Sequence, residues 1–384
     1  MRFEFATATR IIFGPGTLSE VGSLAADMGS RALVVTGKTV SRADPLLAKL
    51  AEQDIAVTIF PVEDEPSVEI ARAGTEKARA AACDMVLGFG GGSAVDAGKA
   101  IAALLTNPGD PLDYLEVIGR GQPLEQPPLP YIAIPTTSGT GAEVTRNAVL
   151  ASKEHRVKVS LRSPLMLPRL AIVDPELTLT VPPAVTASTG LDALTQVLEP
   201  YVSIKATPLT DAICREGLAR AARSLRQAYE HGDDPEAREN MSLVSLFGGL
   251  ALANAKLGAV HGFAGPMGGM FNAPHGAICG RLLPFVMEVN VRALLAREPE
   301  SPALRRYDEI AQILTGEADA TAEDAVAWVQ ALGDVLQVPG LAEYGVTPDA
   351  FSALIEKSSR SSSMKGNPIK LTEDELREIL QRAL

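Results

Sequence analysis

Two of the four histidines in this chain lie in one apolar, glycine-rich tract, Val260–Gly276. His261 and His275 stand 14 residues apart, with Gly, Ala, Met and Phe around them. Imidazoles in such surroundings are expected to be buried or to line a cleft, and each then needs a partner, of which a divalent metal ion is one. Two core histidines hydrogen-bonded to backbone groups would produce the same pattern.

A third candidate ligand is Asp192, whose neighbours Leu191 and Ala193 are apolar. A carboxylate in that setting needs a cation or several hydrogen-bond donors. Gln196 follows four residues later and shares the same helical face. One carboxylate and two imidazoles with an open position form the pattern of a catalytic zinc or similar ion, so Asp192, His261 and His275 are the predicted catalytic set.

A phosphate-binding turn is predicted where a buried strand enters Gly90, Gly91 and Gly92 and a helix follows. Glycines let a phosphate approach the N–H groups of a helix N-terminus, where the helix dipole also favours an anion. Ser93 is the expected N-cap, with Asp96 completing a capping-box-like arrangement. A tight strand-to-helix turn is the alternative, and the spacing does not match G-x-G-x-x-G.

The loop at Pro135–Asn147, PTTSGTGAEVTRN, offers several hydroxyl groups beside two glycines. Such a loop could wrap the ribose or nicotinamide end of a cofactor. An ordinary polar turn, capped by its own side chains, would look the same.

The elements that must position these residues differ between the two halves of the chain. Five short β-rich runs alternate with helical patterns in the first half: Arg31–Thr36, Ile55–Pro61, Asp84–Phe89, Tyr131–Pro135 and Leu170–Val173. Apolar strands alternating with helices predict a parallel sheet covered on both faces.

After Val173–Pro183 the pattern becomes helical: Ala184–Val202, Leu209–Tyr229, Pro235–Ala255, Ala303–Leu314, Ala322–Leu336 and Glu373–Leu384. We therefore predict an α/β dinucleotide-binding domain over residues 1–182 and an all-α domain over 183–384, with the active site in the cleft between them.

Composition excludes several classes of function. A net charge of −12 argues against nucleic acid or an anionic membrane as partner. The three cysteines, Cys83, Cys214 and Cys279, are far apart, so neither a disulfide framework nor a cysteine metal site is predicted. No signal peptide or membrane span is evident, and a cytoplasmic protein is expected.

Several motifs in order resemble the iron-containing (group III) alcohol dehydrogenase family. They are FGPG at Phe13–Gly16, GGGSAVDAGKA, PTTSGTGAEVT, DPELT at Asp174–Thr178, TGLDALTQVLEPYVS, the two-histidine tract and Asn367-Pro368. The resemblance implies a dehydroquinate synthase-like architecture and hydride transfer between NAD or NADP and a small alcohol or aldehyde. It also implies Fe²⁺ or Zn²⁺ polarising the substrate oxygen, and a homodimer or larger assembly.

The resemblance also assigns site residues. The metal ligands correspond to Asp192, Gln196, His261 and His275. The positions that match the family's cofactor contacts are Gly91, Gly92 and Ser93 for the pyrophosphate, Thr136, Thr137 and Thr140 along the cofactor, and Asn147, Lys158 and Leu177.

Three positions depart from the family pattern. Gln196 stands where the family usually has His, and an amide oxygen is a poorer ligand than imidazole. Gly265 stands where a second His often helps proton transfer. Gly37 replaces the Asp that NAD-selective members tend to carry, so Lys38 or Thr39 could accommodate a 2′-phosphate and NADP is favoured.

These departures keep two alternatives open: a metal-independent reductase similar to maleylacetate reductases, and a nucleotide-binding protein that has lost catalysis. A lyase similar to dehydroquinate synthase is disfavoured, because that enzyme needs basic residues for an acidic, phosphorylated substrate and the candidate residues here are mostly apolar and neutral.

Overall fold

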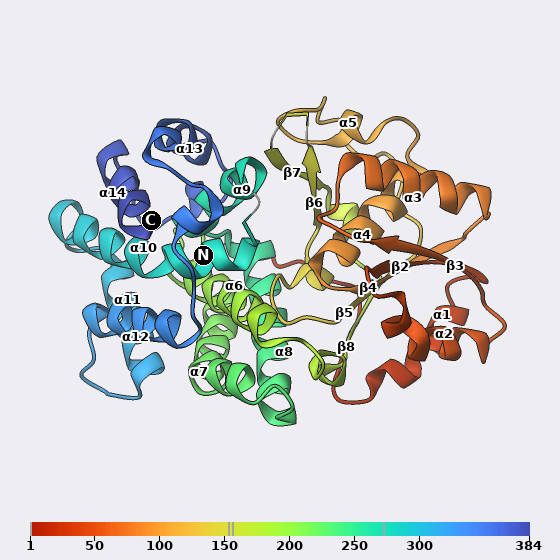
Figure 1. The fold of residues 1–384 in the computed structure, drawn as a ribbon, viewed down its shortest axis with the longest axis horizontal. Helices are drawn as coiled ribbons and strands as arrows, with labels where there is room; N and C mark the ends of the chain where they lie inside the picture. Colours follow the sequence, from red (N-terminus) through yellow and green to blue (C-terminus); the bar gives the residue numbers. More distant parts are fainter. Residues whose placement is uncertain (1, 153, 156, 272) are drawn as a thin grey trace. The chain divides into compact units, whose positions relative to one another are not determined.

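The computed structural model describes residues 2–152, 154–155, 157–271 and 273–384. The chain divides into two compact units (Figure 1). The α/β unit contains Thr7–Thr137 and Gly141–Leu179. The helical unit contains Thr180–Leu384 together with residues 2–6 and the short loop Ser138–Thr140. The main division therefore lies between Leu179 and Thr180.

The α/β unit is built on a six-stranded parallel sheet in the order β1-β8-β5-β4-β2-β3. The strands are β1 (Ile11–Phe13), β2 (Arg31–Gly37), β3 (Ala56–Val62), β4 (Met85–Gly90), β5 (Tyr131–Pro135) and β8 (Leu170–Val173). The predicted parallel sheet is confirmed. Its central strands β4 and β5 are buried along their whole length, as strands covered on both faces must be.

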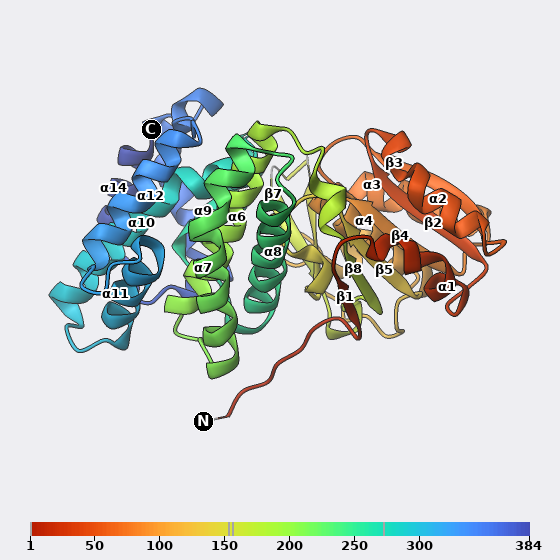
Figure 2. The same ribbon diagram turned by 90° about the horizontal axis from the view of Figure 1, so that it is seen from below.

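Alternate side chains of the strands pack against helices on opposite faces of the sheet. Val34 and Leu87 join the core formed with α1 (Val21–Ala26) and α2 (Asp44–Ala51). Leu33 and Val86 point the other way and pack with α3 (Val68–Ala80) and α4 (Gly92–Thr106). The two helical layers can be followed on either side of the strands in Figures 1 and 2.

Three further elements of this unit were not predicted. β6 (Asn147–Ser152) and β7 (Val157–Arg162) form an antiparallel pair outside the main sheet. A short helix, α5 (Pro111–Tyr114), begins with a capping box from Asp110. The residues of β7, VKVSLR, alternate between apolar and polar, which is a strand signal that the sequence analysis did not use, whereas β6, NAVLAS, has no such alternation in residue type.

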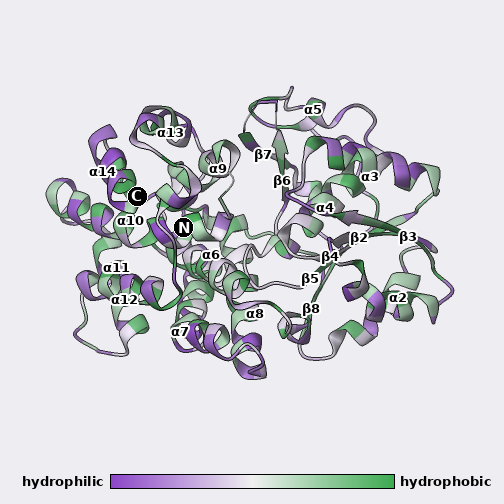
Figure 3. Cartoon of the chain, viewed as in Figure 1, coloured by the Kyte–Doolittle hydropathy of each residue, from purple (hydrophilic) through white to green (hydrophobic). Residues whose placement is uncertain are grey.

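The helical unit contains nine helices among its described residues, and no strand lies in the described part of 180–384. They are α6 (Pro183–Val202), α7 (Pro208–Glu230), α8 (Pro235–Ala255), α9 (Ala259–Met270), α10 (His275–Arg297), α11 (Pro302–Thr315), α12 (Ala322–Val335), α13 (Phe351–Ser359) and α14 (Glu373–Ala383). One continuous apolar core runs through them. Figure 3 shows hydrophilic residues over much of α7, α12 and α14, which lie at the outside of this core.

Among the described residues, no single helix is long and apolar enough to cross a membrane. Helices α8 and α9 meet that criterion only when taken as a pair, and they bend by 99° at the break between them.

Candidate active site

Four buried or half-buried side chains of the helical unit converge on one point. Asp192, His261, His275 and Cys279 each offer one ligand atom, and all four atoms lie within 4.8 Å of one another. The Nε2 atom of His261 lies 3.1 Å from Oδ1 of Asp192, and Nε2 of His275 lies 3.8 Å from the same oxygen. The Sγ atom of Cys279 lies 3.8 Å from Nε2 of His261. Carboxylate, imidazole and thiol groups this close together form a donor set for a divalent ion.

Three helices bring these groups together: Asp192 lies on α6, His261 on α9, and His275 and Cys279 on α10. The contact between α6 and α10 depends on glycine. A Cβ atom at Gly276 would lie 1.9 Å from the carbonyl oxygen of Ser188. Because no side chain fits there, α10 packs directly on the backbone of α6 and its first residue, His275, reaches Asp192.

The ring of His261 is oriented by a carboxylate that the sequence analysis did not identify. Its Nδ1 donates to Oε2 of Glu199 at 2.7 Å, and the other oxygen of Glu199 accepts the backbone N–H of Val260, also at 2.7 Å. Glu199 is 3 % exposed. A carboxylate bonded to one ring nitrogen leaves the other free to bind a metal. Glu199 follows Asp192 by seven residues, two helical turns, which places both on one face of α6.

The side-chain amides of Asn290 and Asn367 connect the helices that carry the two histidines. The side-chain oxygen of Asn367 accepts the backbone N–H of Ala259, the first residue of α9, at 3.1 Å. The Asn367 amide also exchanges hydrogen bonds with Asn290 of α10. Asn367 therefore links the beginning of α9 to α10, which explains why the Asn-Pro pair near the end of the chain belongs with the site motifs.

The charged groups of the cluster shift one another's pKa values. Burial alone would lower the pKa of His261, but the neighbouring Cys279 and the hydrogen bond to Asp192 outweigh it and raise that pKa well above its usual value. Burial likewise lowers the pKa of His275, but the charges of Cys279 and Asp192 outweigh it, so this pKa is also raised. Burial raises the pKa of Asp192, but the two imidazoles bring it below its usual value. The cluster thus attracts positive charge, which protons or a divalent cation can supply.

Access to the cluster is from the side of His275. The side chains of Asp192 and His261 are 3 % and 6 % exposed, whereas that of His275 is 34 % exposed. The candidate centre is therefore enclosed by α6 and α9 and open where α10 begins.

Gln196 makes its hydrogen bond outside this donor set. Its amide nitrogen donates to the carbonyl oxygen of Gly139 at 2.9 Å, in the loop Ser138–Thr140 that belongs to the helical unit. The side chain is 2 % exposed. Gln196 thus anchors this loop to α6, and Ser138 adds a contact to Ser242 of α8 at 3.1 Å between the hydroxyl oxygens.

The sequence offered no reason to place Cys279 near the candidate metal ligands, but its sulfur lies in the same group of donor atoms as Asp192, His261 and His275. Sequence spacing between cysteines carried no signal, because the partners of Cys279 are histidines and a carboxylate. The usable signal was its position four residues after His275, one turn along the same face of α10. Cys83 and Cys214 are free cysteines elsewhere in the structure.

The predicted cofactor residues of the sheet gather at the carboxyl ends of neighbouring strands. Gly37 ends β2, Gly91 follows β4, and Thr136 and Thr137 follow β5. The backbone N–H of Thr136 donates to the carbonyl of Gly90 at 2.9 Å. A Cβ atom at Gly91 would lie 3.3 Å from the hydroxyl of Thr137. The carboxyl edge of an open parallel sheet is where nucleotides bind.

The capping expected from Ser93 is wrong. Gly91 is the N-cap of α4, and no side chain caps this helix, which begins at Gly92. Asp96 instead accepts the backbone N–H of Val149 at 3.0 Å and faces Lys99 at 3.6 Å. An N-terminus that no side chain caps is suited to an anion, because its first N–H groups have no intrahelical acceptor.

The other predicted cofactor residues lie on different elements. Asn147 begins β6, and its backbone carbonyl accepts the ammonium of Lys99. Lys158, on β7, pairs with Glu65 at 3.1 Å. Leu177 lies in the turn after β8 and packs against the core on the α1 and α2 side. Thr140 is exposed and lies in the loop Ser138–Thr140, which is part of the helical unit.

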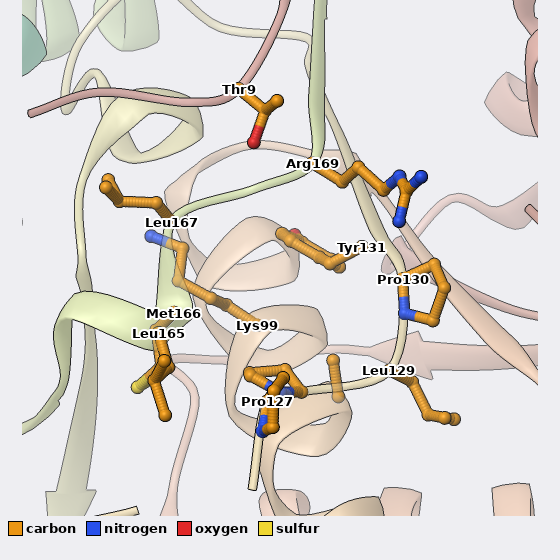
Figure 4. A pocket seen from close by; sticks show the side chains of 12 residues that line it. Thr9, Lys99, Pro127, Leu129, Pro130, Tyr131, Leu165, Met166, Leu167 and Arg169 are labelled. Atoms are coloured by element: carbon orange, nitrogen blue, oxygen red, sulfur yellow. The ribbon is translucent and has the colours of Figure 1, made fainter.

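A separate cavity of about 540 Å³ lies in the α/β unit, where β5 and β8 begin (Figure 4). Lys99 is the buried charged residue on its wall. The Lys99 ammonium donates to the carbonyls of Ala142 and Asn147 and to the hydroxyl of Thr145, which uses all three of its N–H groups. Lys99 therefore holds the segment after β5 onto α4.

The same interaction affects a neighbouring carboxyl group. Burial raises the pKa of Glu143 to about 7, and the positive charge of Lys99 opposes that shift. Burial lowers the pKa of Lys99 itself. Lys99 and Glu143 both belong to the α/β unit.

Comparison with known proteins identifies the class. The family model for iron-containing alcohol dehydrogenase matches residues 8–175. A second family model, for the C-terminal part of the Fe-containing alcohol dehydrogenase family, matches residues 186–384. The chain belongs to the iron-containing alcohol dehydrogenase family. It is an oxidoreductase that transfers hydride between NAD(P) and small alcohols or aldehydes, with iron or a similar metal.

Individual relatives are similar over nearly their whole length. The 1,3-propanediol dehydrogenase of Klebsiella pneumoniae is 36 % identical over 394 residues, covering 99 % of this chain and 98 % of the relative. The choline dehydrogenase of Bacillus subtilis is 35 % identical over 374 residues, covering 96 % and 92 %.

Solved structures show the same fold. A crystal structure of 1,3-propanediol oxidoreductase superposes with a TM-score of 0.92 at 35 % identity and covers 100 % of both chains. A sulfoacetaldehyde reductase from Bifidobacterium kashiwanohense in complex with NAD⁺ has a TM-score of 0.87 at 30 % identity, covering 100 % of this chain and 99 % of the other.

Proposed function

We propose that this chain interconverts a small primary alcohol or diol and its aldehyde with NADP in preference to NAD, using Asp192, His261 and His275 as the catalytic set. The convergence of these three side chains within 4.8 Å is the observation that carries the proposal. The similarity to 1,3-propanediol dehydrogenase supports the substrate class.

The donor set fits the metal that the family implies. One carboxylate, two imidazoles and a thiol are ligands that Fe²⁺ and Zn²⁺ accept. A divalent ion held by Asp192, His261 and His275 would supply the Lewis acidity that polarises the substrate carbonyl. Glu199 keeps Nε2 of His261 directed into the cluster, because it accepts a hydrogen bond from Nδ1 of the same ring.

The proton for the alcohol product needs a route that does not use a side chain at position 265. A Cβ atom at Gly265 would have nothing within 4 Å, so this part of α9 leaves open space. We expect water in that space, or a ribose hydroxyl of the cofactor, to deliver the proton. The remaining cofactor contacts, including Thr140, Asn147, Lys158 and Leu177, are proposed from the family positions they occupy, and a homodimer or larger assembly stays a prediction.

The test is consumption of NAD(P)H by the full chain loaded with Fe²⁺ or Zn²⁺, with propanal, 3-hydroxypropanal and glycolaldehyde as substrates. We expect absorbance loss that depends on the metal and disappears after chelation. Turnover unaffected by chelation would favour the metal-independent reductase. Cofactor binding without turnover across the panel would favour a nucleotide-binding protein that has lost catalysis.

Cofactor preference gives a separate prediction at Gly37. A Cβ atom at this position would have nothing within 4 Å, so an aspartate fits at the end of β2. In Gly37→Asp, the new carboxylate would bind the ribose 2′-OH of NAD and repel the 2′-phosphate of NADP. We expect the ratio of kcat/KM for NADP over NAD to fall about 100-fold, which corresponds to about 2.7 kcal/mol.

The matched control is Gly333→Asp, because Gly333 lies on α12 of the helical unit and also has nothing within 4 Å of its Cβ position. It should leave the ratio unchanged. An equal ratio in Gly37→Asp and the wild type would show that position 37 does not face the 2′ position.

A further inference from the structure

We propose that Cys279 has taken over the place of the fourth metal ligand from position 196, so that this site binds zinc through one carboxylate, two imidazoles and one thiolate. The inference rests on the proposed function, because it concerns the same centre. It adds the identity of the fourth ligand and of the metal.

The side chain of Gln196 is held by a loop contact. The Gln196 amide nitrogen donates to the Gly139 carbonyl at 2.9 Å. Reversing the amide would place two oxygens against each other, so this orientation is the one that the chemistry allows. A Cβ atom at Gly248 would come within 2.9 Å of the Gln196 Cβ, so α8 packs closely against this side chain. Gln196 therefore serves the loop Ser138–Thr140.

The sulfur of Cys279 lies at a distance that suits a metal ligand. Zinc bonds of about 2.0 to 2.3 Å in a tetrahedron place ligand atoms about 3.3 to 3.8 Å apart. The distances between donors of this cluster are 3.1, 3.8 and 3.8 Å for His261 to Asp192, His275 to Asp192 and Cys279 to His261. Cys279 thus lies at ligand spacing from the imidazole, without metal-induced movement.

Cys279 lies among the other donors of the cluster. The residue is 0 % exposed. A buried cysteine usually acts as a small apolar side chain. Here its neighbours are the two imidazoles and the carboxylate: the sulfur lies 3.8 Å from Nε2 of His261 and within 4.8 Å of the other two donor atoms. A thiol among metal donors serves as a ligand more readily than as packing.

The choice of metal follows from the thiolate. Thiolate is a soft ligand that favours zinc over the harder Fe²⁺, and zinc already stands above iron in the general order of affinities. Exchanging an imidazole for an amide at position 196 while adding a thiolate at position 279 keeps four protein donors, and the substrate oxygen would then be a fifth ligand, a coordination number that zinc can reach. This chain should therefore bind zinc more tightly than iron, although its family is defined by iron.

Cobalt substitution tests the thiolate directly, with a readout independent of turnover. The full chain is stripped of metal, loaded with Co²⁺ and examined by absorption spectroscopy. We expect one Co²⁺ per chain and an intense sulfur-to-cobalt charge-transfer band in the near ultraviolet. The band should be absent in Cys279→Ser and Cys279→Ala. It should persist in Cys214→Ala, a buried cysteine on α7 whose charged neighbours are Asp211 and Arg306.

Zinc affinity, measured by competition with a chromophoric chelator, gives the second readout. Removing a ligand group should weaken Zn²⁺ binding in Cys279→Ala by at least as much as losing an outer-shell partner costs, about 10- to 100-fold, and Fe²⁺ binding by less. Wild-type cobalt protein without the charge-transfer band, or a band that survives in Cys279→Ala, would overturn the proposal even if one variant fails to fold.

The outcomes separate this inference from the proposed function. Metal-dependent aldehyde reduction without a sulfur band would leave the function standing and remove Cys279 from the ligand set. A sulfur band with no turnover on any aldehyde would leave the ligand assignment standing and contradict the proposed activity.

Discussion

Replacing Asp192 with asparagine should abolish stoichiometric metal binding and lower kcat/KM for aldehyde reduction about 1,000-fold or more, which corresponds to about 4 kcal/mol. Asn has the same shape as Asp but lacks the charge, and Oδ1 of Asp192 is the atom that both imidazoles approach. Without it, two imidazoles and a thiol must hold a dication with no carboxylate from Asp192, and uncompensated charge beside the buried side chains of α6 and α9 is costly. Metal content by mass spectrometry and steady-state kinetics on the full chain measure both effects.

The matched control is Asp349→Asn, which removes an exposed carboxylate of the same unit. It should retain one metal per chain and wild-type turnover. The melting temperature of both variants separates loss of metal from loss of fold. Full turnover in Asp192→Asn would contradict the catalytic role of the cluster and favour the metal-independent reductase.

The sheet could be predicted because its signals are local. Tyr131–Pro135 and Leu170–Val173 are short apolar runs bounded by Pro or Asp, and both coincide with the strands observed. Pro235–Ala255 likewise coincides with α8, where Asp234 caps the helix through the N–H groups of Glu236 and Ala237. Such boundaries depend on residues within a few positions of the element itself.

The helices that carry the histidines could not be predicted in this way. Glycines at positions 262, 265, 268 and 269 and Pro266 argue against a helix by propensity, yet α9 spans Ala259–Met270. Tertiary packing overrides propensity here, because Gly262 lies so close to Met364 that a Cβ atom would be 2.8 Å from its terminal methyl group. Small residues that weaken a helix alone allow it to pack closely against its neighbours.

The ligand set shows the same limit. Asp192, His261 and His275 could be named from residue type and from the family motifs, and the structure brings them together. Glu199 and Cys279 could not be ranked above other buried acids and cysteines, because their roles depend on which face of α6 and α10 meets α9. Gln196 and Asp192 share a helical face, but the hydrogen bond to Gly139 depends on a loop 57 residues earlier in the chain. Contacts of that range are set by packing, which a sequence pattern does not encode directly.

The second large effect is expected at the glycine-rich turn. Gly91→Val should weaken NADP and NAD binding about 100-fold or more, which corresponds to about 2.7 kcal/mol. Gly91 has φ −70° and ψ −176°, an extended conformation that valine adopts without strain. Its Cβ would contact the Thr137 side chain at 3.3 Å, which a small rotation of the hydroxyl relieves. The fold should therefore persist, while the branched side chain occupies the space before the uncapped N-terminus of α4, where we place the pyrophosphate.

Quenching of protein or NAD(P)H fluorescence gives Kd, and thermal unfolding checks the fold. Gly333→Ala is the control, since its Cβ would have nothing within 4 Å and the change should raise stability by about 0.5 to 1 kcal/mol without altering Kd. Because Gly91 lies in the α/β unit and the donor cluster in the helical unit, Gly91→Val should keep its metal while losing its cofactor, the reverse of Asp192→Asn. A variant that loses both together would show that the two sites are coupled through the fold, whereas wild-type Kd in Gly91→Val would remove the turn from the cofactor site.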